Sequence, residues 1–226
     1  MTDFARQRLT MVETQIRPNE VTDPRLLAAL RALPRERFVP RELRTLAYMD
    51  EGIEVFPSID GAPARFLLAP MVLARLVQLA AVEPQDIMLD VGCATGYSTA
   101  VLAGLGRSVI GLEPEPELAA AARGALREIG VGNAAIVEGP LGRGYRKAGP
   151  YDVIVLNGSV PEPPDALTSQ LSEGGRLVAV LSSGGTFSQG KAYLFIKVGG
   201  EVSGVPHFDA GARPLPGFRP EPCFSF

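Results

Sequence analysis

The chain has 226 residues, which suits one domain with a full hydrophobic core, and its hydrophobic share of 46% and charged share of 21% are ordinary for a globular protein. The net charge of −3 gives no reason to expect a nucleic-acid partner, and no apolar run is long enough to span a bilayer. Cys93 and Cys223 are far apart and His207 is the only histidine, so we expect no metal site. The polar, amphipathic first residues do not resemble a signal peptide, and we expect a cytoplasmic protein.

The first part of the chain has the pattern of a helical extension. Apolar residues at helical spacing predict a helix over 4–16, which we expect Pro18 to end. Asp23 followed by Pro24 predicts the start of a second helix, because an aspartate cap and a proline in the first turn are typical of helix N-termini. Farther along, the sequence predicts a short helix over 41–48, a short strand over 53–56 within an irregular stretch, and a clear helix that begins at Pro70.

From residue 83 onward, predicted strands and helices alternate. The strands are expected at 87–91, 108–113, 134–137, 153–157 and 176–181, and the helices at 97–105, 115–129 and 164–171. Strands separated by helices imply parallel pairing with right-handed crossovers, which is a doubly wound α/β fold. The strands 191–198 and 202–208 flank Gly199 and Gly200 and predict a closing antiparallel hairpin, followed by an irregular tail over 214–226. We expect one structural unit with two parts, a helical cap and substrate-side segment over 1–82 and a Rossmann-like core over 83–226.

The most informative segment joins the first of these strands to its helix. Gly92 can take a positive φ or let the backbone approach a ligand, and Gly96 removes a side chain where the helix starts. The segment is not the dinucleotide fingerprint G-x-G-x-x-G, because Ala94 holds the middle position. It matches better the acidic-x-Gly-x-x-x-Gly loop of methyltransferases that use S-adenosylmethionine (SAM). The predicted SAM contacts in this loop are Asp90, Gly92, Cys93, Ala94, Thr95, Gly96 and Tyr97.

A carboxylate at the end of the next strand strengthens the prediction of a SAM site. Glu113 lies roughly 20 residues beyond the loop, where a doubly wound fold places the acid that binds ribose hydroxyls. The alternative is that Glu113 only caps the following helix, with Pro114 in the first turn. We favour the cofactor site and include Pro114 in it. Cys93 is expected to pack against the cofactor rather than to act as a nucleophile, because no base lies near it in the sequence.

Two further strand ends supply candidate contacts. After the third strand, Gly139, Pro140 and Leu141 are expected beside the cofactor. After the fourth, Asn157 is a candidate for cofactor or substrate contact and Ser159 for substrate contact, because ligands sit at the carboxyl ends of parallel strands. The alternative for Asn157 and Ser159 is an ordinary turn, in which both residue types are common.

The order of these segments resembles the protein-L-isoaspartate O-methyltransferase family over roughly residues 8–181. The resemblance is carried by the segments 11–16, 34–40 (Pro-Arg-Glu-Arg-Phe-Val-Pro), 47–50, 90–97 and 170–178. It implies an enzyme that transfers the methyl group of SAM to a carboxylate of a damaged protein or a related acceptor. No catalytic residue is assigned, because a carboxylate acceptor needs no general base.

The segment before Pro70 departs from that family. The resemblance places a Gly-Gln-Thr-Ile-Ser type sequence there, whose hydroxyls contact the methyl-transfer site, but Phe66 stands at the threonine and Leu68 at the serine. Hydroxyls hydrogen-bond a carboxylate, and apolar side chains cannot. We therefore expect Phe66, Leu67 and Leu68 to line an altered acceptor pocket and isoaspartyl peptides to be methylated weakly or not at all. The alternatives are a methyltransferase for a smaller or more apolar acceptor, and a non-catalytic SAM-binding regulatory protein.

A second departure follows the third strand. The family has a Gly-Asp-Gly type turn that frames the adenine, whereas this chain has Gly139-Pro140-Leu141, and Pro140 also removes a backbone donor. Adenine could be held by Leu141 and backbone atoms, or Glu138 could supply the acid. We favour a rigid loop that forms an apolar wall for the adenine.

Overall fold

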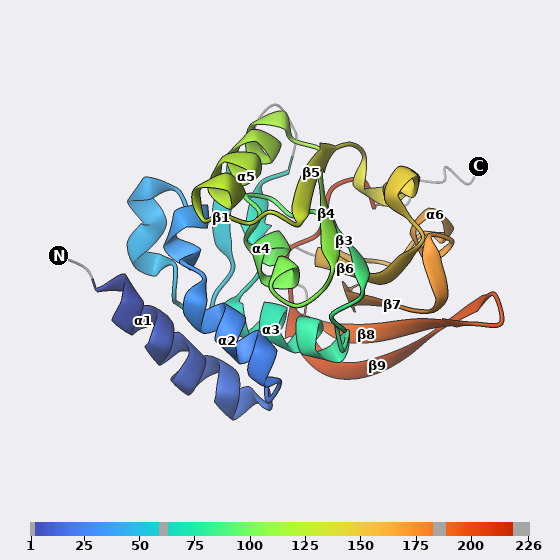
Figure 1. Cartoon of the computed structure of the whole chain (residues 1–226), viewed down its shortest axis with the longest axis horizontal. Helices are drawn as coiled ribbons and strands as arrows, with labels where there is room; N and C mark the ends of the chain where they lie inside the picture. Colours follow the sequence, from blue (N-terminus) through green and yellow to red (C-terminus); the bar gives the residue numbers. More distant parts are fainter. Residues whose placement is uncertain (1–2, 59–62, 183–188, 219–226) are drawn as a thin grey trace, which may run out of the picture.

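The computed structural model describes residues 3–58, 63–182 and 189–218. Within these ranges, a sheet of seven strands has the order β5-β4-β3-β6-β7-β8-β9 (Figure 1). The strands are β3 (Ile87–Val91), β4 (Ser108–Glu113), β5 (Ala134–Glu138), β6 (Tyr151–Val160), β7 (Leu171–Leu181), β8 (Gln189–Val198) and β9 (Glu201–Gly211). The first five in this order pair in parallel, and β8 and β9 are antiparallel. The predicted doubly wound fold with a closing hairpin is confirmed.

Both faces of the central strands are buried. Val153 and Val155 of β6 belong to a hydrophobic cluster with the helices α3 (Pro70–Leu79), α4 (Tyr97–Ala103) and α5 (Pro116–Glu128). Ile154 and Leu156 alternate with them and join a second cluster on the opposite face, which includes α6 (Asp165–Thr168) and Leu215 of the C-terminal segment. A strand buried on both faces is continuously apolar, as the sequence of β6 is.

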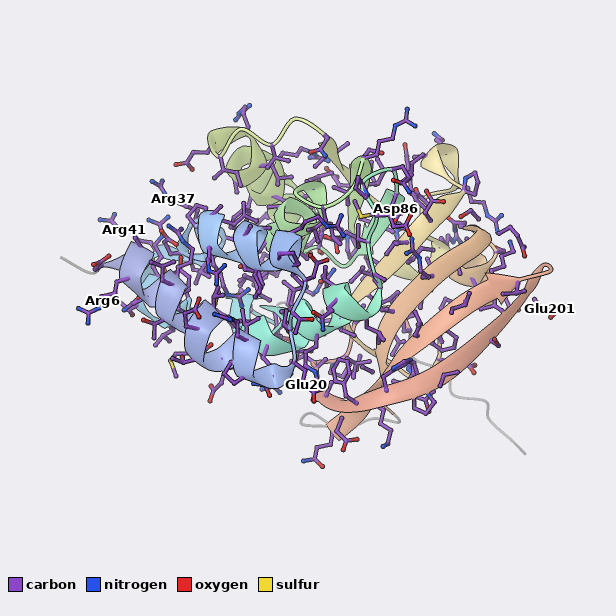
Figure 2. The ribbon with its side chains drawn as sticks, turned by 60° about the horizontal axis from the view of Figure 1, so that its bottom comes forward. Arg6, Glu20, Arg37, Arg41, Asp86 and Glu201 are labelled. Atoms are coloured by element: carbon purple, nitrogen blue, oxygen red, sulfur yellow. The ribbon has the colours of Figure 1, made fainter. Side chains whose placement is uncertain are left out.

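The N-terminal helices flank this core. The helices α1 (Phe4–Met11) and α2 (Pro24–Ala32) lie side by side in Figure 1. Asp23 caps α2 as predicted, and its carboxylate accepts from the backbone N–H groups of Arg25 at 2.8 Å and Leu26 at 3.3 Å. The exposed side chains of Arg6, Arg37 and Arg41 project outward from this side of the molecule (Figure 2).

The first helix reaches residue 16 as predicted, but Pro18 does not end the helical geometry. After α1 the chain continues through a π-helical turn (Val12–Ile16) and a 3-10 turn (Arg17–Asn19), and it leaves helical geometry only at Glu20, where φ is +66°. Pro18 is tolerated because it stands in the first turn of the 3-10 segment, where its missing N–H group is not required. The segment predicted as a helix over 41–48 is also a 3-10 helix (Arg41–Leu46).

The helix predicted over 164–171 is much shorter, because β7 begins at Leu171, five residues before the predicted start at 176. Gly174 and Gly175 suggest a turn but lie within the strand. Gly174 has a φ of +76°, and a Cβ on Gly175 would lie 2.9 Å from the carbonyl oxygen of Tyr151. The two glycines therefore form an irregularity in the ladder between β6 and β7 rather than a turn between elements.

A short two-stranded sheet lies outside the main sheet. Its first strand, β1 (Ile53–Phe56), was predicted, and its second strand, β2 (Arg65–Leu67), was not. β2 contains Phe66 and ends one residue before Leu68, the two positions at which the sequence departs from the family. The predicted irregular tail is described only as far as residue 218, and Pro214 in it forms a parallel bridge to Ser159. The division into 1–82 and 83–226 stays a prediction.

Candidate functional site

The glycine loop lies at the carboxyl end of β3. Gly92 and Gly96 have φ values of +76° and +92°, and Ala94 between them has +49°. The N–H group of Gly92 donates to the carbonyl of Leu112 at 2.8 Å, which ties the loop to β4. A Cβ on Gly96 would lie 3.0 Å from the Cβ of Ala122 in α5, so this glycine permits close packing of the helix start.

Asp90, at the start of the glycine loop, is hydrogen-bonded to the first turn of α4 and to β6. Its buried carboxylate accepts hydrogen bonds from Ser98 Oγ at 2.7 Å, from Thr99 Oγ1 at 2.5 Å and from the side-chain amide of Asn157. Burial raises the pKa of Asp90 to about 6, although the three donors oppose the shift. The structure thus places the predicted cofactor contacts Asp90 and Asn157 against each other, with the Asp90 side chain pointing into the protein.

The raised pKa of Asp90 makes a prediction about stability. The folded protein holds this proton more tightly than the unfolded chain, whose pKa is near 3.8, so stability should fall as pH rises through the interval between the two values. The Asp90→Asn variant lacks this titration. The free energy of unfolding of wild type, relative to that variant, should fall by about 2–2.5 kcal/mol from pH 4 to pH 7. Urea unfolding at several pH values checks this, and a constant or rising difference contradicts it.

Glu113 is fully buried, and its carboxylate already has three partners. Oε2 accepts from the N–H group of Ala94 at 2.8 Å, and Oε1 accepts from the N–H group of Glu115 at 3.3 Å. Oε1 also forms an ion pair with the guanidinium of Arg65 in β2. Burial raises the pKa of Glu113, and the charge of Arg65 opposes this rise. The acid predicted to bind a ribose is therefore held by a side chain that sequence reasoning missed.

Arg65 contacts Glu113 and lies close to Gly92 of the glycine loop. Its side chain is only 5% exposed, and Nη2 has no hydrogen-bond partner among the described residues. Nη2 would lie 3.2 Å from a Cβ placed on Gly92. The guanidinium thus lies beside both the backbone of Gly92 and Oε1 of Glu113, where the sequence predicts the ribose.

The C-terminal segment covers the same loop. The backbone of Ser159 donates to Arg213 at 2.8 Å and accepts from Leu215 at 2.9 Å, so the segment pairs with the end of β6. A Cβ on Gly92 would lie 2.8 Å from Leu215 Cδ2, and one on Gly158 would lie 2.7 Å from Leu215 Cγ. The structure places Ser159, a predicted substrate contact, beneath this segment with 3% of its surface exposed.

Two cavities border the C-terminal segment, one at Leu215 and one at Pro216, Gly217 and Phe218. One, of about 200 Å³, is lined by Arg65, Phe66, Leu68, Asn157, Arg213 and Leu215, with Leu67 also in its wall. The other, of about 590 Å³, is lined by residues that follow β4, β5 and β6, among them Pro114, Pro140, Leu141 and Pro161, and by Phe218 of the C-terminal segment. The structure brings Phe66, Leu67 and Leu68 to the first cavity but not Ser159, and it brings Pro114, Pro140 and Leu141 to the second but not Gly139.

The remaining loop residues face the protein interior. Cys93 is buried, which raises the pKa of its thiol well above the usual value, so it is a poor nucleophile at neutral pH. Thr95 Oγ1 donates to the carbonyl of Phe38 at 2.6 Å, and the Tyr97 ring packs edge-on against Phe38 with centroids 5.5 Å apart. These contacts hold the glycine loop against the segment 34–40, which connects α2 to the 3-10 helix at Arg41–Leu46 and is called the connector below.

The same connector positions the acceptor segment. Arg35 is fully buried, and it donates from Nη2 to the carbonyl of Leu68 at 2.8 Å and from Nε to the carbonyl of Ala47 at 2.8 Å. Its guanidinium carbon lies 4.7 Å from the centroid of the Tyr97 ring. The lack of solvent lowers the pKa of Arg35. Arg35 thus links the acceptor segment to the start of α4.

The turn after β5 has no acid directed at the site. Gly139 donates its N–H group to the carbonyl of Glu113 at 3.3 Å, Pro140 is extended, and Leu141 is buried beside Gly92. The carboxylate of Glu138 pairs instead with Arg123 at 2.9 Å, and both side chains are nearly half exposed. The contacts of this turn favour the apolar wall over an acid supplied by Glu138.

In the described ranges, no group of three His, Cys, Asp or Glu side chains could hold a metal ion. No helix among the described residues is both long enough and apolar enough to cross a membrane.

The fold, the glycine loop and the acid after the second strand of the alternation define a SAM-dependent methyltransferase. The model of the family "Protein-L-isoaspartate(D-aspartate) O-methyltransferase (PCMT)" matches residues 6–199. The chain therefore belongs to this family. It is 36% identical over 183 residues to the protein-L-isoaspartate O-methyltransferase of Koribacter versatilis, covering 81% of this chain and 80% of the relative. It is 37% identical over 174 residues to that of Methanoculleus marisnigri, covering 77% and 76%.

Solved structures share the fold. A protein-L-isoaspartate O-methyltransferase superposes with a TM-score of 0.77 and 23% identity, covering 94% of this chain and 65% of that one. A second structure, a putative protein-L-isoaspartate O-methyltransferase from Plasmodium falciparum in complex with S-adenosyl-L-homocysteine (SAH), has a TM-score of 0.73 and 18% identity, covering 95% and 99%.

The groups at the predicted site fit SAM, but part of the space is filled. The loop offers backbone N–H donors, and the Glu113 carboxylate offers acceptor oxygens of the kind that suit ribose hydroxyls. Arg65 pairs with Glu113 and lies close to Gly92, and Leu215 packs on Gly92, so both side chains occupy space beside these groups. A bound cofactor needs both side chains to move.

Proposed function

We propose that this methyltransferase acts on the carboxylate of an isoaspartyl or related residue in a protein or peptide. Membership of the family over residues 6–199 carries the proposal. The cavity of about 200 Å³ beside Asn157 adds a place for the acceptor next to the glycine loop. A cytoplasmic location and the absence of a nucleic-acid partner stay predictions.

The proposed cofactor contacts divide into three groups. The backbone of Gly92 to Gly96 would hold the amino-acid end of SAM, and Glu113 would accept hydrogen bonds from the ribose hydroxyls. Pro114, Pro140 and Leu141 would form the apolar wall for the adenine. When bound, SAM supplies a methyl group that its sulfonium makes electrophilic.

The chain's own part in the reaction is to position the acceptor and exclude water. An acceptor carboxylate is ionised at neutral pH and needs no base, so alignment and a dry pocket are what the protein must provide. Phe66, Leu67 and Leu68 supply apolar surface that excludes water, and Asn157 supplies a polar edge whose amide is already bound to Asp90. Hydroxyl donors at 66 and 68 are absent from the sequence.

We predict a low catalytic efficiency on a peptide with one isoaspartyl residue. A kcat/KM below about 10⁴ M⁻¹s⁻¹ is expected, because Phe66 and Leu68 cannot donate to the acceptor carboxylate. The double variant Phe66→Thr with Leu68→Ser should raise kcat/KM by about tenfold, since each regained hydrogen bond to a charged group is worth about 1.5–3 kcal/mol, partly offset by lost packing. Transfer of a radiolabelled methyl group measures both.

The control is the double variant Phe66→Val with Leu68→Ala, which reduces bulk without adding hydroxyls. It should not raise kcat/KM. An efficiency of wild type above the stated limit would contradict the prediction and show that the hydroxyls are dispensable. An equal gain in the control would show that bulk, rather than the missing hydroxyls, limits activity.

One observation favours a second candidate, a smaller or more apolar acceptor. The walls of the 200 Å³ cavity at Phe66, Leu67 and Leu68 are apolar over three consecutive residues. Under this alternative, wild type would methylate an apolar carboxylic acid faster than an isoaspartyl peptide in the same assay.

A further inference from the structure

The ion pair between Arg65 and Glu113 occupies a place that a ligand must take. Glu113 is the proposed partner of the ribose, and its Oε1 atom is paired with Arg65. Both side chains are buried, so the guanidinium cannot remain beside Glu113 while a ribose binds there. Binding of the cofactor therefore requires Arg65 to find another anion, because a buried cation without one is strongly disfavoured.

The neighbouring cavity is suited to supply that anion. Arg65 itself lines it, and Arg213 lines it as well, with its guanidinium carbon 4.9 Å from the centroid of the Phe66 ring. Among the described residues that line this cavity, none is acidic. The described lining thus combines two arginines with the polar Asn157 and Gln189 and with apolar side chains, and a carboxylate that enters this cavity would meet the guanidinium of Arg65.

The Nη2 atom of Arg65 gives a second, independent indication. It is buried and has no hydrogen-bond partner among the described residues. A guanidinium normally binds a carboxylate with two parallel N–H groups, and here Nη1 alone contacts Glu113. The donor capacity of Arg65 is therefore only partly used in its contact with Glu113.

We propose that Arg65 exchanges Glu113 for the carboxylate of the acceptor when the cofactor's ribose takes Glu113. The inference rests on the proposed function for the identity of the acceptor. In this exchange Arg65 gives the acceptor carboxylate one charged partner, without the two further donors that hydroxyls at positions 66 and 68 would add, and it makes the two ligands assist each other's binding. The acceptor class is accordingly an anion, and a neutral analogue of the same shape should bind without this assistance.

Calorimetric titration of SAH tests the exchange without any methyl transfer. The Arg65→Gln variant keeps a polar side chain but removes the charge that competes for Glu113, so it should bind SAH at least fivefold more tightly than wild type when no peptide is present. The matched control is Arg176→Gln, which breaks the other largely buried ion pair, Arg176 with Asp86 at 2.6 Å, at the amino end of β3 (Figure 2). It should leave SAH affinity unchanged.

A second titration measures the assistance between the ligands in wild type and does not depend on the variant's folding. A saturating hexapeptide with one isoaspartyl residue should raise SAH affinity at least fivefold. The same peptide with isoasparagine, which is neutral, should not, and Arg65→Gln should lose the effect. Weaker or unchanged SAH binding by a folded Arg65→Gln would overturn the exchange, and so would equal effects of the two peptides. If only the proposed function is wrong, Arg65→Gln will still bind SAH more tightly than wild type, but neither peptide will change the SAH affinity of wild type. That result would show that the isoaspartyl carboxylate is not the anion that Arg65 binds.

Discussion

Replacing Glu113 by alanine should weaken SAH binding by at least about a hundredfold. A ribose diol makes two hydrogen bonds to a carboxylate, and hydrogen bonds to charged groups contribute about 1.5–3 kcal/mol each, so their joint loss exceeds the 2.8 kcal/mol or so that corresponds to a factor of one hundred. Calorimetric titration measures the change. Thermal shift at a fixed SAH concentration gives a second readout, because a ligand of the folded state raises Tm.

Glu115→Ala is the matched control. Glu115 lies two residues farther along, and its contact with the site is through its backbone N–H group, which alanine retains. The SAH affinity of Glu115→Ala should stay within about twofold of wild type. That change in binding free energy is far smaller than the loss of one hydrogen bond to a charged group would cause. The Glu113→Ala protein is also expected to be less stable by about 3–5 kcal/mol, because Arg65 is left buried without its anion. Titrations should therefore be made at a temperature where circular dichroism shows it folded, and equal SAH affinities of the two variants would remove Glu113 from the cofactor site.

The position of Glu113 could be predicted because it depends on local order. A strand, a glycine loop, a helix and a second strand that ends in an acid follow one another in the sequence, and parallel pairing of β3 with β4 brings the acid to the loop. The hydrogen bond from the N–H group of Ala94 to Glu113 Oε2 is consistent with this order of strand, loop, helix and strand. The predicted role of Glu113 toward a ribose stays a prediction.

Arg65 could not be predicted in the same way. It belongs to a strand of three residues in a stretch rich in glycine and proline, and its partner is 48 positions farther along the chain. No motif around Arg65 identifies its partner, and a solvated arginine could stand in the same sequence. The one available signal is that Arg65 directly precedes the apolar residues 66–68. In a β-strand, alternate side chains lie on the same face, so a strand that buries Leu67 also buries Arg65.

The contacts of Asp90 and Leu215 also depend on long-range packing. Asn157 reaches Asp90 because β6 lies next to β3, although 67 positions separate the two residues. Leu215 belongs to a segment without helical or strand periodicity, and its place on Gly92 follows from backbone pairing with Ser159. The residue types of Asn157 and Leu215 suit a strand end and a tail, and this can be recognised from the sequence. Their partners, Asp90 and Gly92, follow from the order of strands in the sheet, which the sequence does not state.

Gly92→Ala should lower the free energy of unfolding by about 2–5 kcal/mol. The φ of +76° costs an L-residue about 1–2 kcal/mol, and the new Cβ would lie 2.8 Å from Leu215 Cδ2 and 3.2 Å from Arg65 Nη2, so packing must shift at a further cost of about 1–3 kcal/mol. The same methyl group also projects into the space proposed for SAM, so SAH affinity should fall as well. Urea unfolding and calorimetric titration measure the two effects.

Gly124→Ala is the control in which the same chemical change should have the opposite sign. Gly124 lies within α5, a Cβ there meets nothing within 4 Å, and its φ is not in the left-handed region. Alanine should raise the free energy of unfolding by about 0.5–1 kcal/mol, because it restricts the unfolded chain and favours the helix. SAH affinity should not change. If Gly92→Ala were as stable as wild type and bound SAH equally well, the backbone at Gly92 would not closely approach the cofactor, and the tail at Leu215 would have to be displaced without cost.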